Sequence, residues 1–369
     1  MVLQIASWNI LDHTAVKYMT LGTPVVCQDS SCGGLDFQNV VEKNYRDRYT
    51  DIIKLIEQEL VQGRPGVDII CLQEVHVNFK DMLESRMREA GWNYQLFFNL
   101  ESGLLSLFRK TLLVVQDRDC AVVKVPSLRA SWGDESEGND EDMAGRGRNN
   151  DRGGGLKIQV FKVRKLDEGG VNKNFYVVNT HFPGKPGKSM DYARGNALRR
   201  IVGKLKKCWP AGQKFSMLLV GDLNQPGAHE LFGSMVEEFK DGTLMMPRMD
   251  PSIATSYHRF QMEKVGLVGG LIGGMQKETW EQKPTSEWYT QIDYLIHTSD
   301  WKMGRGNGQM VMPSGGMIGY ETPYKPENYV ELELYFFSGG KDKPKFVDNF
   351  KMNKGGWLSD HALIRYVLN

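Results

Sequence analysis

Short runs of apolar, β-branched and aromatic residues recur along the chain, separated by polar or glycine-containing segments. Runs of this length and composition are typical of β-strands that are partly or fully buried. The predicted strands are Leu3–Asn9, Val67–Gln73, Tyr94–Phe98, Leu104–Phe108, Thr111–Gln116, Leu156–Val163, Phe175–Thr180, Ser216–Gly221, Ile292–His297 and Ala362–Leu368.

Apolar residues at helical spacing predict fewer helices than strands. In Tyr45–Leu60 one face collects Tyr49, Ile52, Ile53, Ile56 and Leu60. Further helices are predicted over Phe79–Ala90, over Met190–Cys208 and from a start near Ala228. Because several strands follow one another without an intervening helix, a two-sheet core flanked by helices fits better than a doubly wound parallel sheet.

Residues 127–155 interrupt this pattern with a polar, glycine-rich stretch that has an acidic block followed by a basic one. Such a composition predicts a disordered surface insertion. The glycine-rich stretch at residues 266–276 is apolar, which does not suit a solvated linker, and the sequence gives no account of it. With no internal repeat and no interdomain linker, we predict a single catalytic domain over residues 1–369 that carries the insertion.

The composition of the 369 residues, 41% apolar and 25% charged, is that of a globular protein with a large core. A net charge of +1 creates no global field for nucleic acid or membranes. The odd set of cysteines, without a C-x-x-C pair, argues against a disulfide framework and a structural zinc site. These cysteines are Cys27, Cys32, Cys71, Cys120 and Cys208.

The start of the chain lacks the pattern of a signal peptide, and no run approaches the roughly 20 apolar residues of a membrane span. We therefore expect an intracellular protein, cytoplasmic or nuclear, with reduced thiols. The segment THFPGKPGKS at residues 180–189 ends like a nucleotide-binding loop, but Phe182 stands where that loop needs its first glycine. Pro186 also lacks a backbone N–H, so an ATP site is not expected there.

Most predicted strands end at, or lie beside, a polar side chain that can bind metal or phosphate. These residues are Asn9, Glu74, His181, Asp222, Asn224, Asp293, Asp360 and His361. Taken singly, each has a structural interpretation as a turn residue, a helix cap or a buried histidine. Their recurrence at strand ends favours a shared site.

The motifs around these residues are SWNI, LQEV, NTHF, GDLN, IDYLI and SDHALI, in that order between residues 7 and 364. The ordered set resembles the endonuclease/exonuclease/phosphatase superfamily of metal-dependent phosphoesterases. The resemblance implies a four-layered α/β sandwich, with two mainly antiparallel sheets face to face and helices outside. It does not extend to residues 127–155, nor to much of 240–285 and 300–355.

The resemblance also implies a metal site. Hydrolysis of an anionic phosphodiester needs a cation on the non-bridging oxygens, a base for water and donors for the developing charge. Glu74 would supply a carboxylate oxygen suited to Mg²⁺, for which Mn²⁺ can substitute, with Asn9 and Asp360 as neighbours in a water-rich shell.

Roles for the other residues follow from the same resemblance. Asp222 would be the general base, and Asn224 would donate an amide hydrogen from the same side of an extended segment. His361 would contact the scissile phosphate, with Asp293 holding its other ring nitrogen. His181 would donate to a non-bridging oxygen.

Basic residues follow His181 closely and have two open interpretations. Lys185, Lys188 and Arg194 can contact flanking phosphates of a substrate beside the site. Equally, the basic residues of this segment can form the solvated face of an amphipathic helix.

The branch of the family is indicated by two segments. GDLNQP and QIDYLI lack the features of the inositol-phosphate branch, whereas the arginine-bearing helix before LQEV resembles the deadenylase and nocturnin-like branch. A nucleic acid or nucleotide substrate is therefore favoured, and no protein partner can be inferred. Two alternatives stay open: a sphingomyelinase-like lipid phosphodiesterase, for which residues 329–346 would form a membrane-dipping hairpin, and a non-catalytic binding module.

Overall fold

The computed structural model describes residues 2–13, 25–27, 40–42, 45–63, 66–115, 156–166, 172–182, 188–225, 242–246, 256–268, 277–290, 292–301, 309–311, 317–318, 359, 361 and 363–369. The chain forms two compact units, each assembled from separate segments. Unit 1 comprises Met1–Thr111, Arg248–Gln291 and Met303–Asn369, and unit 2 comprises Leu112–Pro247 and Ile292–Lys302.

Unit 1 is built on a seven-stranded sheet with the order β16-β15-β17-β1-β4-β6-β5. Its strands are β1 (Leu3–Asn9), β4 (Ile69–Gln73), β5 (Tyr94–Asn99), β6 (Leu104–Arg109), β15 (Gln309–Val311), β16 (Met317–Ile318) and β17 (Ile364–Leu368). Strands β1 and β4 are parallel, with Asn9 opposite Gln73, and the other neighbours are antiparallel. The parallel pair brings the ends of β1 and β4 to the same edge.

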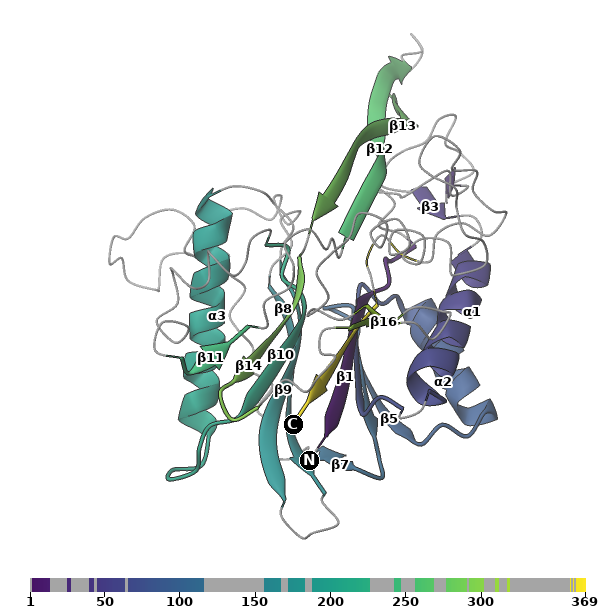
Figure 1. Ribbon diagram of the computed structural model, residues 1–369. Helices are drawn as coiled ribbons and strands as arrows, with labels where there is room; N and C mark the ends of the chain where they lie inside the picture. Colours follow the sequence, from purple (N-terminus) through teal and green to yellow (C-terminus); the bar gives the residue numbers. More distant parts are fainter. Residues whose placement is uncertain are drawn as a thin grey trace, which may run out of the picture. The chain divides into compact units, whose positions relative to one another are not determined.

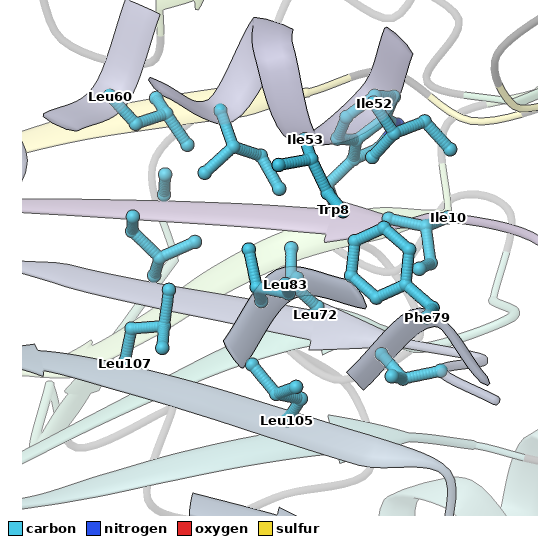
Figure 2. Packing of buried hydrophobic residues seen from close by; sticks show 14 of the residues in the cluster. Trp8, Ile10, Ile52, Ile53, Leu60, Leu72, Phe79, Leu83, Leu105 and Leu107 are labelled. Atoms are coloured by element: carbon cyan, nitrogen blue, oxygen red, sulfur yellow. The ribbon is translucent and has the colours of Figure 1, made fainter. Parts of the chain in front are cut away.

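Helices α1 (Tyr45–Leu55) and α2 (Val77–Glu89) lie on one face of this sheet (Figure 1). Figure 2 shows that their apolar side chains meet those of the strands, with Ile52 and Phe79 packed around Trp8 and Leu72. Burying such side chains contributes about 1.5–3 kcal/mol each. This packing fixes α1 and α2 against the strands that end in Asn9 and Gln73.

The predicted helix Tyr45–Leu60 is confirmed, but its last part widens into a π-helix, η1 (Ile56–Val61). Glu57 is buried there and accepts hydrogen bonds from Arg86 at 2.8 Å and from Trp92 Nε1 at 3.3 Å. A buried carboxylate needs such partners. The π-helix therefore contains a buried glutamate, Glu57, that forms an ion pair with Arg86 of α2.

Unit 2 is built on a six-stranded sheet with the order β11-β14-β10-β9-β8-β7. Its strands are β7 (Leu113–Val115), β8 (Lys157–Lys165), β9 (Lys173–His181), β10 (Met217–Asp222), β11 (Leu244–Met245) and β14 (Asp293–Thr298). Only β9 and β10 are parallel to each other among these neighbours. Helix α3 (Lys188–Cys208) covers one face of the sheet, where Ile201 and Leu205 pack with Val178 and Leu219.

Two separate hairpin-like sheets have no counterpart among the predicted strands. Strand β2 (Val25–Cys27) pairs with β3 (Val40–Glu42), and β12 (Ser256–Val268) pairs with β13 (Lys277–Thr290), both antiparallel. The glycine-rich stretch at 266–276 begins inside β12, and its remainder lies outside the described residues. Register shifts at His258/Phe260 and Lys264/Gly266 break the simple alternation that would have predicted β12.

Every strand predicted from the apolar pattern is confirmed, with boundaries shifted by a few residues. The predicted fold class is also confirmed as α/β, with two mainly antiparallel sheets and flanking helices. The predicted helix near Ala228, the insertion at 127–155 and the hairpin at 329–346 lie outside the described residues. Among the helices described, none combines the length and apolar character needed to cross a membrane.

Candidate active-site residues at the strand ends

In unit 1, Asn9 and Glu74 are brought together by the parallel strands β1 and β4. Asn9 closes β1 and is fully buried, and Glu74 directly follows Gln73 at the end of β4. The Nδ2 atom of Asn9 donates a hydrogen bond to Oε1 of Glu74 at 3.0 Å. Glu74 has φ 53°, a left-handed conformation that costs a non-glycine residue about 1 kcal/mol or more. The fold thus holds Glu74 in a strained, fixed orientation beside Asn9.

His361 joins the same group from the segment before β17. Its Nε2 atom lies 3.4 Å from Nδ2 of Asn9, its backbone carbonyl accepts from Nε1 of Trp8 at 2.9 Å, and its N–H donates to Oγ of Ser359 at 3.1 Å. Ser359 in turn donates its hydroxyl hydrogen to the carbonyl of Asn9. His361 is therefore fixed against β1 by main-chain contacts. Asp360, the third predicted metal neighbour, lies outside the described residues.

The donor set of this unit fits a hard divalent cation. Glu74 offers carboxylate oxygens, and Asn9 offers an amide oxygen that also accepts from Leu11 N at 3.1 Å. Mg²⁺ prefers oxygen ligands from one or two carboxylates and otherwise retains water. The chemistry of Glu74 and Asn9 is consistent with that preference.

In unit 2, three predicted residues occupy adjacent places on neighbouring strands. Asp222, the last residue of β10, is opposite His181 on β9 and opposite Asp293 on β14. The Nε2 atom of His181 lies 3.6 Å from Oδ2 of Asp222. Carboxylate oxygens of Asp222 and Asp293 lie within 4.8 Å of each other, and both residues are buried. The strand register therefore gathers an imidazole and two carboxylates at one edge.

Asn224 belongs to the same edge, but the expected extended geometry is wrong. Strand β10 ends at Asp222, and Asn224 has φ 48°, a left-handed conformation that asparagine tolerates better than most residues. Its backbone N–H donates to Oδ1 of Asp222 at 2.8 Å, and its Nδ2 donates to the carbonyl of Phe182 at 2.8 Å. Asn224 thus orients the Asp222 carboxylate through a turn.

Gly221 allows β9 and β10 to approach closely at this edge. Its φ is 142°, and a Cβ at this position would lie 1.9 Å from the carbonyl oxygen of Thr180. Only glycine fits such a place, because any side chain would collide with the neighbouring backbone. The position before Asp222 therefore requires glycine for a steric reason.

The predicted substrate-binding residues are placed unevenly. Arg194, on α3, is 2% exposed and its Nη1 atom donates to Oε1 of buried Gln225 at 3.0 Å. Lys185 lies outside the described residues, and Lys188 begins α3 with a side chain that is not described. Substrate contact by these three residues stays a prediction. On the same helix, exposed basic side chains occur at Arg199, Arg200, Lys206 and Lys207.

Beside Glu74, His76 belongs to a ring cluster that sequence reasoning missed. Its ring lies 4.3 Å from that of His13, which stacks on Tyr45 at 4.2 Å. His76 caps α2, because its Nδ1 atom accepts from the backbone N–H of Asn78 at 3.1 Å. Burial lowers the pKa of His76, which favours the neutral ring that this acceptor role requires.

Arg48 is the other missed residue near this group. It is 4% exposed, and its guanidinium donates to the carbonyls of Ile10 and Leu11, directly after Asn9. A signal was present in the sequence, because Arg48 precedes Ile52 by one helical turn and so places a cation on the apolar face of α1.

Comparison with known proteins gives matches among solved structures alone. No family model and no curated protein match the chain. ANGEL2, a 2′,3′-cyclic phosphatase in complex with adenosine-2′,3′-vanadate, is 12% identical with a TM-score of 0.50, over 100% of this chain and 95% of that chain.

Two further structures are similar at lower TM-scores. The human Nocturnin catalytic domain with bound sulfate is 13% identical with a TM-score of 0.48, over 100% of this chain and 94% of that chain. An endonuclease/exonuclease/phosphatase family protein from Bacteroides thetaiotaomicron is 13% identical with a TM-score of 0.47, over 100% and 98%. Taken with the two mixed sheets, the likeness to ANGEL2 shows that the chain shares the fold of that protein, an α/β fold built on two mainly antiparallel sheets.

Proposed function

We propose that the protein is a divalent-metal-dependent phosphodiesterase that acts on a nucleic acid or nucleotide. The observation that carries this proposal is the gathering of the predicted polar residues at the ends of two parallel strand pairs. Unit 1 brings Asn9, Glu74 and His361 together, and unit 2 brings His181, Asp222 and Asp293 together. We propose that these residues carry out the hydrolysis.

The metal is assigned to Glu74, with Asn9 and Asp360 as neighbours. A bound Mg²⁺ or Mn²⁺ neutralises charge on the phosphoester. Glu74 suits this role because the hydrogen bond from Asn9 and the left-handed backbone both hold its carboxylate in one direction. A preorganised ligand loses little entropy when it binds a cation.

Asp222 is assigned as the general base that accepts the proton of the attacking water. Its Oδ1 atom accepts from the backbone N–H of Asn224, while Oδ2 faces His181. The amide contact holds the carboxylate in place, so one oxygen can be directed at a water molecule. His181, half-buried beside it, is suited to donate a hydrogen bond to a non-bridging oxygen as charge accumulates there.

His361 is assigned to contact the phosphate, with Asp293 as the residue that orients it. Main-chain contacts to Trp8 and Ser359 fix the backbone of His361, which leaves orientation of its ring to side-chain partners. The partnership with Asp293 stays a prediction.

A polyanionic substrate is favoured by the charge on α3. Over the C-terminal half of this helix the exposed side chains include Arg199, Arg200, Lys206 and Lys207, and no acidic residue occurs between positions 192 and 208. Basic side chains on one solvent face attract a phosphate backbone. ANGEL2, with the same fold, is a 2′,3′-cyclic phosphatase whose structure holds adenosine-2′,3′-vanadate.

A substrate panel tests the proposal. Single-stranded RNA, poly(A), single- and double-stranded DNA, a 2′,3′-cyclic nucleotide and sphingomyelin are offered to the wild type, Asp222→Asn and Glu74→Gln. We expect turnover of a nucleotide-containing substrate that is lost in EDTA, restored by Mg²⁺ or Mn²⁺, and lost in both variants. Undiminished turnover after verified metal removal would contradict the metal assignment, and turnover of sphingomyelin alone would favour a lipid phosphodiesterase.

A further inference from the structure

We propose that Arg48 is a positioning residue that sets the geometry of the Asn9–Glu74 pair and thereby the affinity of the protein for a divalent cation. The inference rests on the proposed function, because it takes Glu74 as a metal ligand. All the residues that carry it lie in unit 1.

Arg48 contacts the turn that follows β1 through both ends of its guanidinium. Its Nη1 atom donates to the carbonyl of Ile10 at 2.7 Å, and its Nη2 atom donates to the carbonyl of Leu11 at 2.8 Å. These are short, charge-assisted hydrogen bonds in a buried place, where such bonds are strongest. The backbone directly after Asn9 is therefore fixed by a side chain of α1.

The turn that Arg48 holds is strained and touches the Asn9 side chain. Leu11 has φ 56°, a conformation that a leucine adopts only when its surroundings impose it. In this conformation its backbone N–H donates to Oδ1 of Asn9 at 3.1 Å. The other end of the same amide, Nδ2, donates to Oε1 of Glu74 at 3.0 Å. Displacing Leu11 would therefore release the amide that orients the Glu74 carboxylate.

Tyr49, the next residue of α1, holds the following part of the same segment. Its hydroxyl oxygen accepts from the backbone N–H of His13 at 3.2 Å, and its ring lies 5.1 Å from the Arg48 guanidinium carbon. Tyr49 is fully buried against Phe79, with ring centroids 5.1 Å apart. Consecutive residues of α1 thus anchor the segment to the core, and Arg48 is the member that acts on Leu11.

Lysine cannot reproduce this contact. The planar guanidinium directs two N–H groups at two carbonyl oxygens at once, whereas an ammonium is a single, flexible point of charge. Arg48→Lys therefore keeps the charge and most of the side-chain volume but loses the paired contact with Ile10 and Leu11. This variant separates positioning from simple charge.

The test measures cation binding without relying on turnover. Mg²⁺ and Mn²⁺ are titrated by calorimetry, and the shift in melting temperature at saturating metal is recorded for the wild type, Arg48→Lys, Arg48→Ala and Glu74→Gln. Loss of a residue that orients a metal ligand typically weakens affinity about 10- to 100-fold. We expect that range for Arg48→Lys and Arg48→Ala, with no detectable binding for Glu74→Gln.

Arg86→Ala serves as the matched control for lost stability. Arg86 is an arginine of the same unit that contacts Glu57 at 2.8 Å and lies in the last turn of α2, at the end of the helix away from Glu74 in sequence. We expect this variant to lower the melting temperature without metal and to keep wild-type metal affinity. Addition of guanidinium at millimolar concentration should partly restore the affinity of Arg48→Ala and leave that of Arg86→Ala unchanged.

The outcomes distinguish the two proposals. If Glu74→Gln loses metal while both Arg48 variants bind as tightly as Arg86→Ala, the positioning role is overturned and the metal assignment stands. If Glu74→Gln binds metal like the wild type, both are overturned. Should Arg48→Ala fail to fold, Arg48→Lys alone decides, because wild-type affinity in that variant would overturn the inference.

Discussion

The Nε2 atom of His181 lies 3.6 Å from Oδ2 of Asp222, at the edge where the parallel strands β9 and β10 end. This separation is longer than a full hydrogen bond. The Asp222 carboxylate instead takes its directed contact from the backbone of Asn224. His181 and Asp222 are thus neighbours with separate tasks in the proposed reaction.

Because of these separate tasks, His181→Ala should lower kcat by roughly 10²–10³ with little change in KM, as expected when a donor acts mainly in the transition state. Steady-state kinetics on the substrate identified by the panel measures both constants. His297→Gln is the matched control, because His297 is a buried histidine about 13 Å along β14 from Asp293. Equal loss of kcat in the two variants would argue against a catalytic role for His181.

The close approach at Gly221 predicts a large and local loss of stability. Gly221→Ala places a methyl group 1.9 Å from the Thr180 carbonyl at φ 142°, and should cost about 3 kcal/mol or more, or prevent folding. Gly212→Ala is the control: it has φ 78° with open space around it, and should cost only about 1 kcal/mol. Urea unfolding of both variants gives the free energies, and similar values would contradict the steric account.

The carboxylate of Asp300 should make the free energy of unfolding of unit 2 depend on pH in the acidic range. Burial alone would raise the pKa of Asp300, but hydrogen bonds from Thr298 and Ser216, and the nearby ammonium of Lys173, together lower it. The Ser216 hydroxyl donates to Asp300 at 2.7 Å, and Lys173 lies 3.0 Å away. Because the folded pKa is below the unfolded value near 3.9, the contribution is present above about pH 4 and is lost as pH falls through the folded pKa.

Denaturant unfolding from pH 7 to pH 2 checks this prediction on the wild type and Asp300→Asn. We expect the difference in unfolding free energy between them to be constant above about pH 5 and to shrink below about pH 4. A difference that stays constant down to pH 2 would show that the Asp300 carboxylate does not titrate differently in the folded protein.

The exposed basic side chains of α3 should determine how strongly KM depends on salt, without changing kcat. Replacing Arg199, Arg200, Lys206 and Lys207 together by glutamine should raise KM for an oligonucleotide, reduce the dependence of KM on salt by about 0.7 in logarithmic slope per lost phosphate contact, and leave kcat near wild type. A control removes the same charge from exposed positions of unit 1, at Arg46, Lys54, Arg88 and Lys110. Equal effects of the two quadruple variants would indicate general charge rather than a binding face.

The sequence by itself determined most strands of the two larger sheets and the polar residues at their ends, but not the short strands β11, β15 and β16. Strand β1 occupies Leu3–Asn9 as predicted, because Leu3, Ile5, Ala6 and Trp8 make a short, mainly apolar run of the kind that buried strands have. Asn9, Glu74 and Asp222 were identified by the same logic, since a polar side chain directly after such a run marks the end of a strand. Both signals are local, so they can be read from the sequence without knowledge of the fold.

Only the tertiary structure decided how these residues are oriented. The left-handed backbones of Glu74 and Asn224 follow from contacts with Asn9 and Phe182, far away in sequence, and no local propensity favours that conformation for glutamate. The inward direction of Arg194, which a basic helix face would place in solvent, depends on its bond to Gln225. His361 is held near Asn9 by a hydrogen bond from Nε1 of Trp8 to its backbone carbonyl, between residues from opposite ends of the chain. Periodicity records which face of an element is buried, but the partner that a polar group finds there depends on pairings between distant segments.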